Sequence, residues 1–121
     1  MHEMGIANSV LDAVRAEQLR LPNGHIHKVG VRIGELAGVD PNAMSFCFEA
    51  LVRDTELEPL ALEIEFCPRR FQCRACGHSY AASRDDFACP ECAMPDVQFL
   101  GGDELEIAYL EVEDGARAAG A

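Results

Sequence analysis

Apolar residues recur at steps of three and four near the start of the chain, and this spacing predicts an amphipathic helix over residues 5–19. Its apolar positions are Ala7, Val10, Leu11 and Val14. A second helix is predicted over residues 40–53. Asp40 suits its N-cap, and Pro41 suits its first turn, where no amide hydrogen is needed. The side chains expected to be buried by this second helix are Met44, Cys47, Phe48 and Leu51.

Other segments alternate between apolar and polar residues, which is typical of strands with one buried face. A strand over residues 25–33 is predicted to bury Val29, Val31 and Ile33. A second strand, over residues 60–66, has its apolar positions at Leu60, Leu62, Ile64 and Phe66. Residues 97–100 and 104–112, on either side of two glycines, are predicted to form a hairpin or two short strands.

Four of the six cysteines form two Cys-x-x-Cys pairs, Cys73 with Cys76 and Cys89 with Cys92, separated by twelve residues. Each such turn directs two sulfur atoms at one point, so two turns supply the four thiolates of a tetrahedral zinc site. Iron in the same cage is the alternative, and disulfides are disfavoured in a reducing compartment. Because four thiolates fill the coordination shell, the site is expected to be structural and not catalytic.

The order of the elements predicts an α+β fold: a small three-stranded sheet with two helices, plus an inserted four-cysteine zinc-ribbon domain. The base domain is expected to be discontinuous, over residues 1–66 and 97–113. The ribbon occupies residues 67–96, and residues 114–121 are expected to be a flexible tail.

The net charge of −11 repels phosphate backbones, so nucleic acid is not an expected partner. The ribbon differs from the rest, because residues 67–95 hold four arginines against three carboxylates. Without a long apolar run or a signal-peptide pattern, the protein is expected in the cytoplasm with no membrane partner. Without a Ser–His–Asp arrangement, a phosphate-binding loop or an open metal site, it is not expected to be an enzyme.

The second residue is a histidine, which brings three nitrogen donors close together. They are the α-amine of Met1 and the backbone nitrogen and Nδ1 of His2. Nitrogen donors in one plane suit square-planar Ni(II) or Cu(II). Most histidines at chain ends are solvated and have no role, so these residues alone leave both interpretations open.

Taken together, these motifs resemble the HypA/HybF family of hydrogenase nickel-incorporation proteins over residues 1–113. The cysteine pairs and the start of the chain carry the resemblance jointly, because either feature alone is common. The second pair departs from the family, which usually has glycine at the position of Ala93. The other matching segments are Met1-His2-Glu3, Gly34-Glu35-Leu36, Asp40-Pro41, residues 46–51 before Thr55, and residues 102–107.

The resemblance implies a nickel metallochaperone of [NiFe] hydrogenase maturation, with Ni(II) as cargo and Zn(II) in the four-cysteine site. It implies that nickel is bound by the Met1 amine, by His2, and by the backbone nitrogens of His2 and Glu3. The implied partners are a GTPase maturation protein and the hydrogenase large-subunit precursor. From the ribbon alone, the alternative is a protein-interaction module of transcription or translation machinery.

Overall fold

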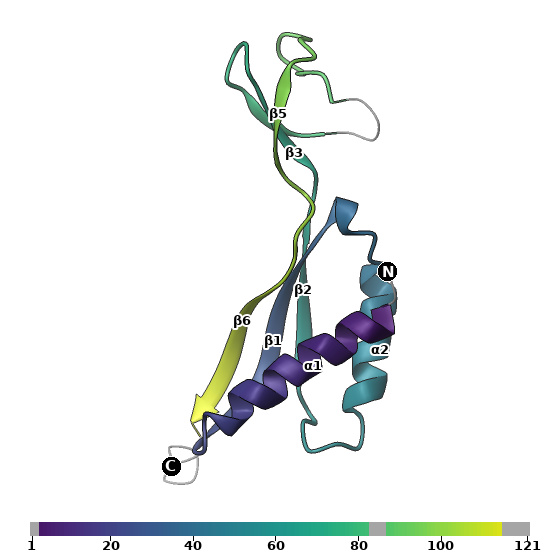
Figure 1. The fold of residues 1–121 in the computed structure, drawn as a ribbon, viewed down its shortest axis with the longest axis vertical. Helices are drawn as coiled ribbons and strands as arrows, with labels where there is room; N and C mark the ends of the chain where they lie inside the picture. The colour runs from purple at the N-terminus through teal and green to yellow at the C-terminus, as the bar shows by residue number, and fades with distance from the viewer. Residues whose placement is uncertain (1–2, 83–86, 115–121) are drawn as a thin grey trace.

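The computed structural model describes residues 3–82 and 87–114 of the 121-residue chain. The molecule is elongated, with a sheet and two helices at one end and a smaller sheet at the other (Figure 1). Three of the predictions fall outside the described residues. They concern Met1 and His2, the charged residues 84–86 of the ribbon, and residues 115–121 of the tail.

The larger sheet has the strand order β2-β1-β6. β1 spans Gly24–Gly34, β2 spans Ala61–Cys67 and β6 spans Leu105–Asp114. β2 runs parallel to β1, and β6 runs antiparallel to it. A parallel pair needs a crossover connection, which the helix α2 (Pro41–Val52) supplies. With α1 (Glu3–Leu19) before β1, the predicted three-stranded sheet with two helices is confirmed.

The start of α2 is formed as its sequence predicts. Oδ1 of Asp40 accepts hydrogen bonds from the backbone N–H groups of Asn42, at 2.9 Å, and Ala43, at 3.4 Å. Pro41 follows at the first helical position. A short 3₁₀ helix, η1 (Glu35–Ala37), precedes α2 and ends at a glycine with φ of 74°. α1 begins at Glu3, two residues before its predicted start.

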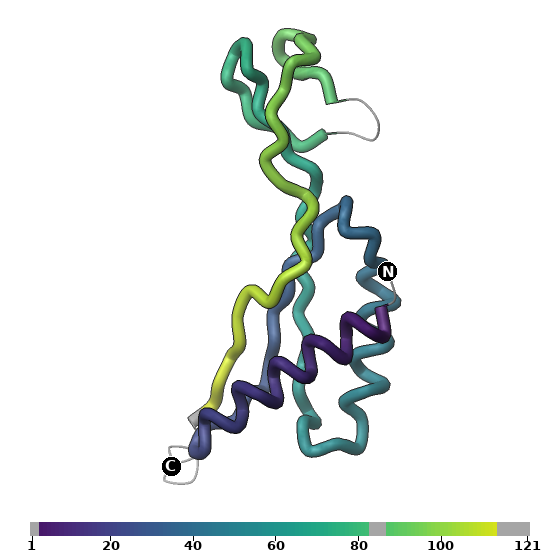
Figure 2. Tube along the Cα trace, in the orientation of Figure 1, coloured from purple at the N-terminus to yellow at the C-terminus, as the bar shows by residue number. Residues whose placement is uncertain are grey.

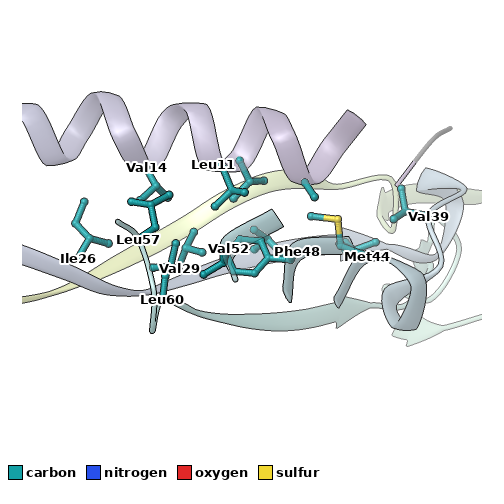
Figure 3. Packing of buried hydrophobic residues seen from close by; sticks show 14 residues of the cluster. Leu11, Val14, Ile26, Val29, Val39, Met44, Phe48, Val52, Leu57 and Leu60 are labelled. Carbon is teal, nitrogen blue, oxygen red and sulfur yellow. The ribbon is translucent and has the colours of Figure 1, made fainter. Parts of the chain in front are cut away.

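Both helices cover the same face of the larger sheet, and the core lies between them and that face (Figure 3). Every apolar position predicted for α1 is buried, as are the three predicted for β1. α2 buries Met44, Phe48 and Val52, whereas Cys47 and Leu51 are half-buried. The prediction for Phe66 is wrong, because its side chain is 51% exposed near the end of an edge strand.

The other face of the larger sheet is open and charged. Lys28 and Arg32 project from its central strand, β1, and lie at 3.0–3.8 Å from carboxylates of both neighbouring strands. Such exposed pairs contribute about 0–1 kcal/mol each, so they define this face more than they stabilise it. The carboxylates belong to Glu63, Glu65, Glu106 and Glu111.

The smaller sheet has the order β4-β3-β5 and is antiparallel. β3 spans Arg70–Cys73, β4 spans Ser79–Ala81 and β5 spans Val97–Gly101. β5 and β6 are therefore two strands of different sheets and not a hairpin (Figure 2). By strand pairing, residues 97–101 lie with the cysteine segment, although the sequence placed them in the base domain. The physical reason is the contact of Phe99 with Phe71 across the strands, at 5.7 Å between ring centroids.

Three chain segments meet where the two sheets join: the end of β1, the link from β2 to β3, and the link from β5 to β6. The N–H of Gly34 donates to the carbonyl of Glu104, and the N–H of Leu36 donates to the carbonyl of Gly102, both at 2.7 Å. These bonds fasten the link between β5 and β6 to the end of β1.

An ion pair lies at the same junction. The side chain of Arg69, between β2 and β3, is 11% exposed, and its Nε lies 3.2 Å from Oε2 of Glu35. This Nε has no hydrogen-bond partner, so the contact is an ion pair without hydrogen-bond geometry. The backbone N–H of Arg69 donates to the other carboxylate oxygen at 3.1 Å. Glu35 therefore binds the link to the smaller sheet through both of its oxygens.

Candidate metal centre

The four cysteines of the two pairs converge in the smaller sheet unit. Their sulfur atoms all lie within 4.8 Å of one another. The Cys73 and Cys92 sulfurs are 3.5 Å apart, and the Cys76 and Cys89 sulfurs are 3.6 Å apart. Sulfurs at about 2.3 Å from a tetrahedral ion lie about 3.8 Å from each other. The cluster therefore has nearly the dimensions that a tetrahedral metal site requires.

The two pairs are held by turns of the same construction. In the first turn, the N–H of Gly77 donates to the carbonyl of Cys73 at 2.9 Å. In the second, the N–H of Ala93 donates to the carbonyl of Cys89 at 2.8 Å. Both turns place the residue after the pair in the left-handed region, with φ of 80° at Gly77 and 62° at Ala93. The second turn therefore forms without the glycine that such a position favours.

Among the residues that the structure describes, this unit has a small core. Its buried residues are Cys73, Tyr80 and Cys89, with Phe71 and Val97 packed against them. Tyr80 also donates a hydrogen bond to the carbonyl of Phe87. Because two of the three buried residues are themselves cysteines of the cluster, the core and the candidate metal site are one structure.

The thiols of the cluster differ in acidity. The backbone N–H of Cys76 lowers the pKa of the Cys73 thiol from 9.0 to about 7. For the Cys92 thiol, the backbone N–H of Met94 lowers the pKa. The hydrogen bond with Cys73, together with burial and the other two thiols, has the larger effect and raises the pKa of Cys92 to about 12. One thiol of the cluster thus ionises readily while another holds its proton. Four thiolates so close together require a cation, and binding one releases protons.

His78 follows the first pair closely but does not join the cluster. Its ring stacks on Tyr80, with centroids 5.9 Å apart, and its Nε2 lies 4.0 Å from a carboxylate oxygen of Glu91. Within residues 3–82 and 87–114, the cysteines form the group that could hold a metal ion.

Of the residues that the resemblance implies for nickel, the structure describes Glu3. Its Oε2 accepts a hydrogen bond from the backbone N–H of Asp40 at 3.1 Å, and this bond lowers the pKa of the Glu3 carboxyl. The first turns of α1 and α2 are therefore adjacent, and each has a carboxylate at the positive end of a helix dipole (Figure 1). The sequence had indicated Asp40 as an N-cap, but not its contact with Glu3.

Sequence reasoning also missed the contact of Glu35 with Arg69. In the sequence, Glu35 stands out only as part of the Gly34-Glu35-Leu36 motif, and nothing in its spacing indicates a partner 34 residues away. An acidic residue soon after the end of a predicted strand is a signal too common to identify such a contact.

Comparisons of the sequence with known proteins all identify the same family. A family model described as "Hydrogenase/urease nickel incorporation, metallochaperone, hypA" matches residues 1–112. A hydrogenase maturation factor HypA of Desulfosudis oleivorans is 36% identical over 115 residues, which covers 94% of this chain and all of the relative. The hydrogenase maturation factor HypA of Alkalilimnicola ehrlichii is 39% identical over 113 residues, which covers 93% of this chain and all of that relative.

Solved structures agree with the sequence matches. The Ni metallochaperone HypA from Helicobacter pylori has a TM-score of 0.57 and 25% identity, covering 92% of this chain and 97% of that one. Another HypA solution structure has a TM-score of 0.64 at 23% identity, covering 94% of this chain, and supports the fold alone. Neither helix of the described chain is long and apolar enough to cross a membrane.

Proposed function

The chain belongs to the HypA family of nickel-incorporation metallochaperones, and from this premise we propose that it carries Ni(II) at its N-terminus for delivery during maturation of [NiFe] hydrogenase. The observation that carries this proposal is the family match, which runs from residue 1 to residue 112 and so includes both the start of the chain and the cysteine cluster. A family match over the cysteines alone would support a zinc-ribbon interaction module as well as it supports a nickel carrier.

The proposed nickel ligands are the amine of Met1, the imidazole of His2, and the backbone nitrogens of His2 and Glu3. Four nitrogens in a plane suit Ni(II), and a set formed by the chain end is open to exchange with a partner. Two features support the proposal: Glu3 begins α1, and its side chain is tied to the start of α2. The ligand-bearing segment therefore emerges from a fixed point of the base domain.

The four-cysteine cluster is proposed to hold a structural Zn(II). Four sulfur donors at nearly tetrahedral spacing fit this ion, which has no geometric preference of its own. When bound, the metal supplies cross-linking and no reactivity, since the four sulfurs leave no coordination position open. Cys73, Cys76, Cys89 and Cys92 then join two turns into one unit.

The proposed recipients and partners are the hydrogenase large-subunit precursor and a GTPase of the maturation pathway. The support for them is membership of a family whose relatives are named hydrogenase maturation factors. An unblocked amine that binds cargo at the surface is suited to transfer by ligand exchange with such a recipient.

Nickel binding is tested by equilibrium dialysis of zinc-loaded protein with a native Met1 amine. His2→Ala is expected to weaken nickel binding by at least about tenfold, because a ligand is removed. Acetylating the Met1 amine should do the same, because it removes that donor. Binding by the native chain should also weaken below about pH 6.5, where the imidazole takes up a proton.

His27→Ala is the matched control, because His27 is a half-exposed histidine of β1 and is not a proposed ligand. Its nickel affinity should equal that of the unmodified chain. If His2→Ala and the N-acetylated chain both bind nickel at the unmodified affinity, the N-terminal site is disproved.

A further inference from the structure

An apolar groove lies between α1 and β6 in the larger sheet unit. α1 crosses the sheet diagonally, so that it diverges from the part of β6 nearest the smaller sheet (Figure 1). The groove left there has a volume of about 360 Å³, which is within the range of sites that take a side chain or small ligand. Its apolar lining includes Ile6, Val10, Ile33, Met44, Leu105 and Ile107.

The groove borders an edge of the sheet. Among the described residues, β6 pairs with β1 on one side and with no strand on the other. Leu105 and Ile107 face the groove and are each 38% exposed. An edge strand beside an apolar groove can accept an extended peptide, which pairs with the backbone and places alternate side chains in the groove.

The charge of this edge selects what can pair with it. Residues 103–114 contain six carboxylates and neither lysine nor arginine. Glu106 and Glu111 lie on the open face, where they pair with cations of β1. A strand added to β6 would therefore have a groove-facing side next to apolar residues and an opposite side next to carboxylates.

We propose that β6 and its groove bind an extended segment of a partner protein in which apolar residues alternate with lysine or arginine. The apolar side chains enter the groove beside Leu105 and Ile107, and the basic ones lie near Glu106 and Glu111. This goes beyond the proposed function and does not require nickel. Because Ile6 lies one turn after Glu3, a segment bound here would be close to the start of α1.

The probe is the peptide Lys-Val-Lys-Ile-Lys-Val-Lys with blocked ends, added to the full zinc-loaded chain without nickel. Its affinity is measured by fluorescence anisotropy, and backbone contacts are measured by amide hydrogen exchange. Ile107→Ser is expected to weaken binding by roughly tenfold, because the groove loses an apolar contact. Amides of β6 should become protected on binding, while those of β2, the opposite edge, should not.

The matched variant is Val112→Ser, which changes a 45% exposed residue of the same strand outside the groove lining. It should alter the affinity by less than about twofold. The matched peptide is Lys-Lys-Val-Ile-Val-Lys-Lys, which has the same composition without the alternation and should bind at least about tenfold more weakly.

Three results would overturn the proposal. Equal binding of the two peptides would show charge attraction alone. Protection of β2 amides in place of β6 amides would show that the peptide binds at the opposite edge of the sheet. The third result is self-association of the unmodified chain, measured by sedimentation, that the Ile107→Ser variant lacks. It would show that a second copy of this chain occupies the groove. Because hydrogen exchange is read on the unmodified chain, the test does not depend on the folding of a variant.

Discussion

At the scale of single residues, Ala93 has an unfavourable backbone conformation in the second cysteine turn. Its φ of 62° lies in the left-handed region, where a Cβ approaches the backbone oxygen. Gly77 occupies the equivalent position of the first turn without this penalty. The hydrogen bonds of the two turns are otherwise alike. The second turn is thus formed against the preference of its own residue.

Replacing this residue by glycine should therefore stabilise the protein. Ala93→Gly is expected to raise the free energy of unfolding of the zinc-loaded chain by about 1 kcal/mol. The converse substitution, Gly77→Ala, should lower it by a similar amount. Denaturant unfolding measures both. A destabilised Ala93→Gly variant would show that the turn is not strained at this position.

Tyr109 is a second residue with a distinct environment. Its ring lies against Gly30 of the neighbouring strand, where a Cβ would overlap the ring, and its hydroxyl donates to Glu63 on the far strand. Glu63, Gly30 and Tyr109 are aligned by the strand register into one row across all three strands. The hydrogen bond to Glu63 raises the pKa of Tyr109 from 10.0 to about 12.

This raised pKa predicts a dependence of stability on pH. The tyrosine is protonated in both states below about pH 10, where its contribution is fully present. Between about pH 10 and 12 the unfolded state loses its proton first, so the contribution is lost as the pH rises. Tyr109→Phe should therefore show a smaller decline in melting temperature over this interval. If the melting temperature of Tyr109→Phe declines as much as that of the unmodified chain, the decline is caused by other groups, such as Lys28.

At the scale of elements, the two sheets differ in what stabilises them. The larger sheet has a continuous apolar core under two helices, whereas the described residues of the smaller sheet unit include three that are buried, two of them cysteines. A unit with so small a core depends on cross-links. The two sheets should therefore respond very differently to loss of metal.

Cys89→Ser is expected to unfold the smaller sheet while the larger one stays folded, because structural zinc contributes an apparent ~10–16 kcal/mol in small units. Amide exchange should show loss of protection over β3, β4 and β5 alone. Cys47→Ser is the matched control, because this free cysteine of α2 lies outside the cluster. Retained protection in β3 after metal removal would show that the small core suffices.

At the scale of the whole molecule, the junction between the sheets decides how the two ends are oriented. Two chain segments connect them, and the end of β1 is bonded to both. Glu35 contacts the backbone and the guanidinium of Arg69, whose side chain is almost fully covered. Polar contacts among the described residues therefore help to fix this orientation.

Arg69→Met, which keeps the apolar stem and removes the charge, should loosen this orientation. We expect small-angle scattering to give a larger radius of gyration. The free energy of unfolding should fall by about 1 kcal/mol or less, because the Glu35 carboxylate remains partly solvated. Arg70→Met changes the exposed neighbour and should leave both quantities unaltered. Identical scattering of the two variants would show that the hydrogen bonds at 2.7 Å hold the junction alone.

Much of the fold could be predicted from local patterns. The helix periodicity predicted the buried residues of α1, and Asp40 with Pro41 predicted the start of α2. The spacing of the cysteines predicted a cluster that the structure forms. The assignment of Met1, His2 and Glu3 to nickel, the identity of zinc, and the domain roles stay predictions, because they concern ligands and residues beyond the described geometry.

The sequence by itself determined the features that depend on near neighbours: helix faces, the cap of α2, and sulfur pairs in tight turns. Tertiary structure alone decided that β5 joins β3 while β6 returns to β1, that Glu35 meets Arg69, and that a groove remains beside β6. The physical reason is range. Hydrogen bonds and rotamers within a turn act between residues a few positions apart, whereas strand pairing and ion pairs select among many distant partners by the packing of the whole chain.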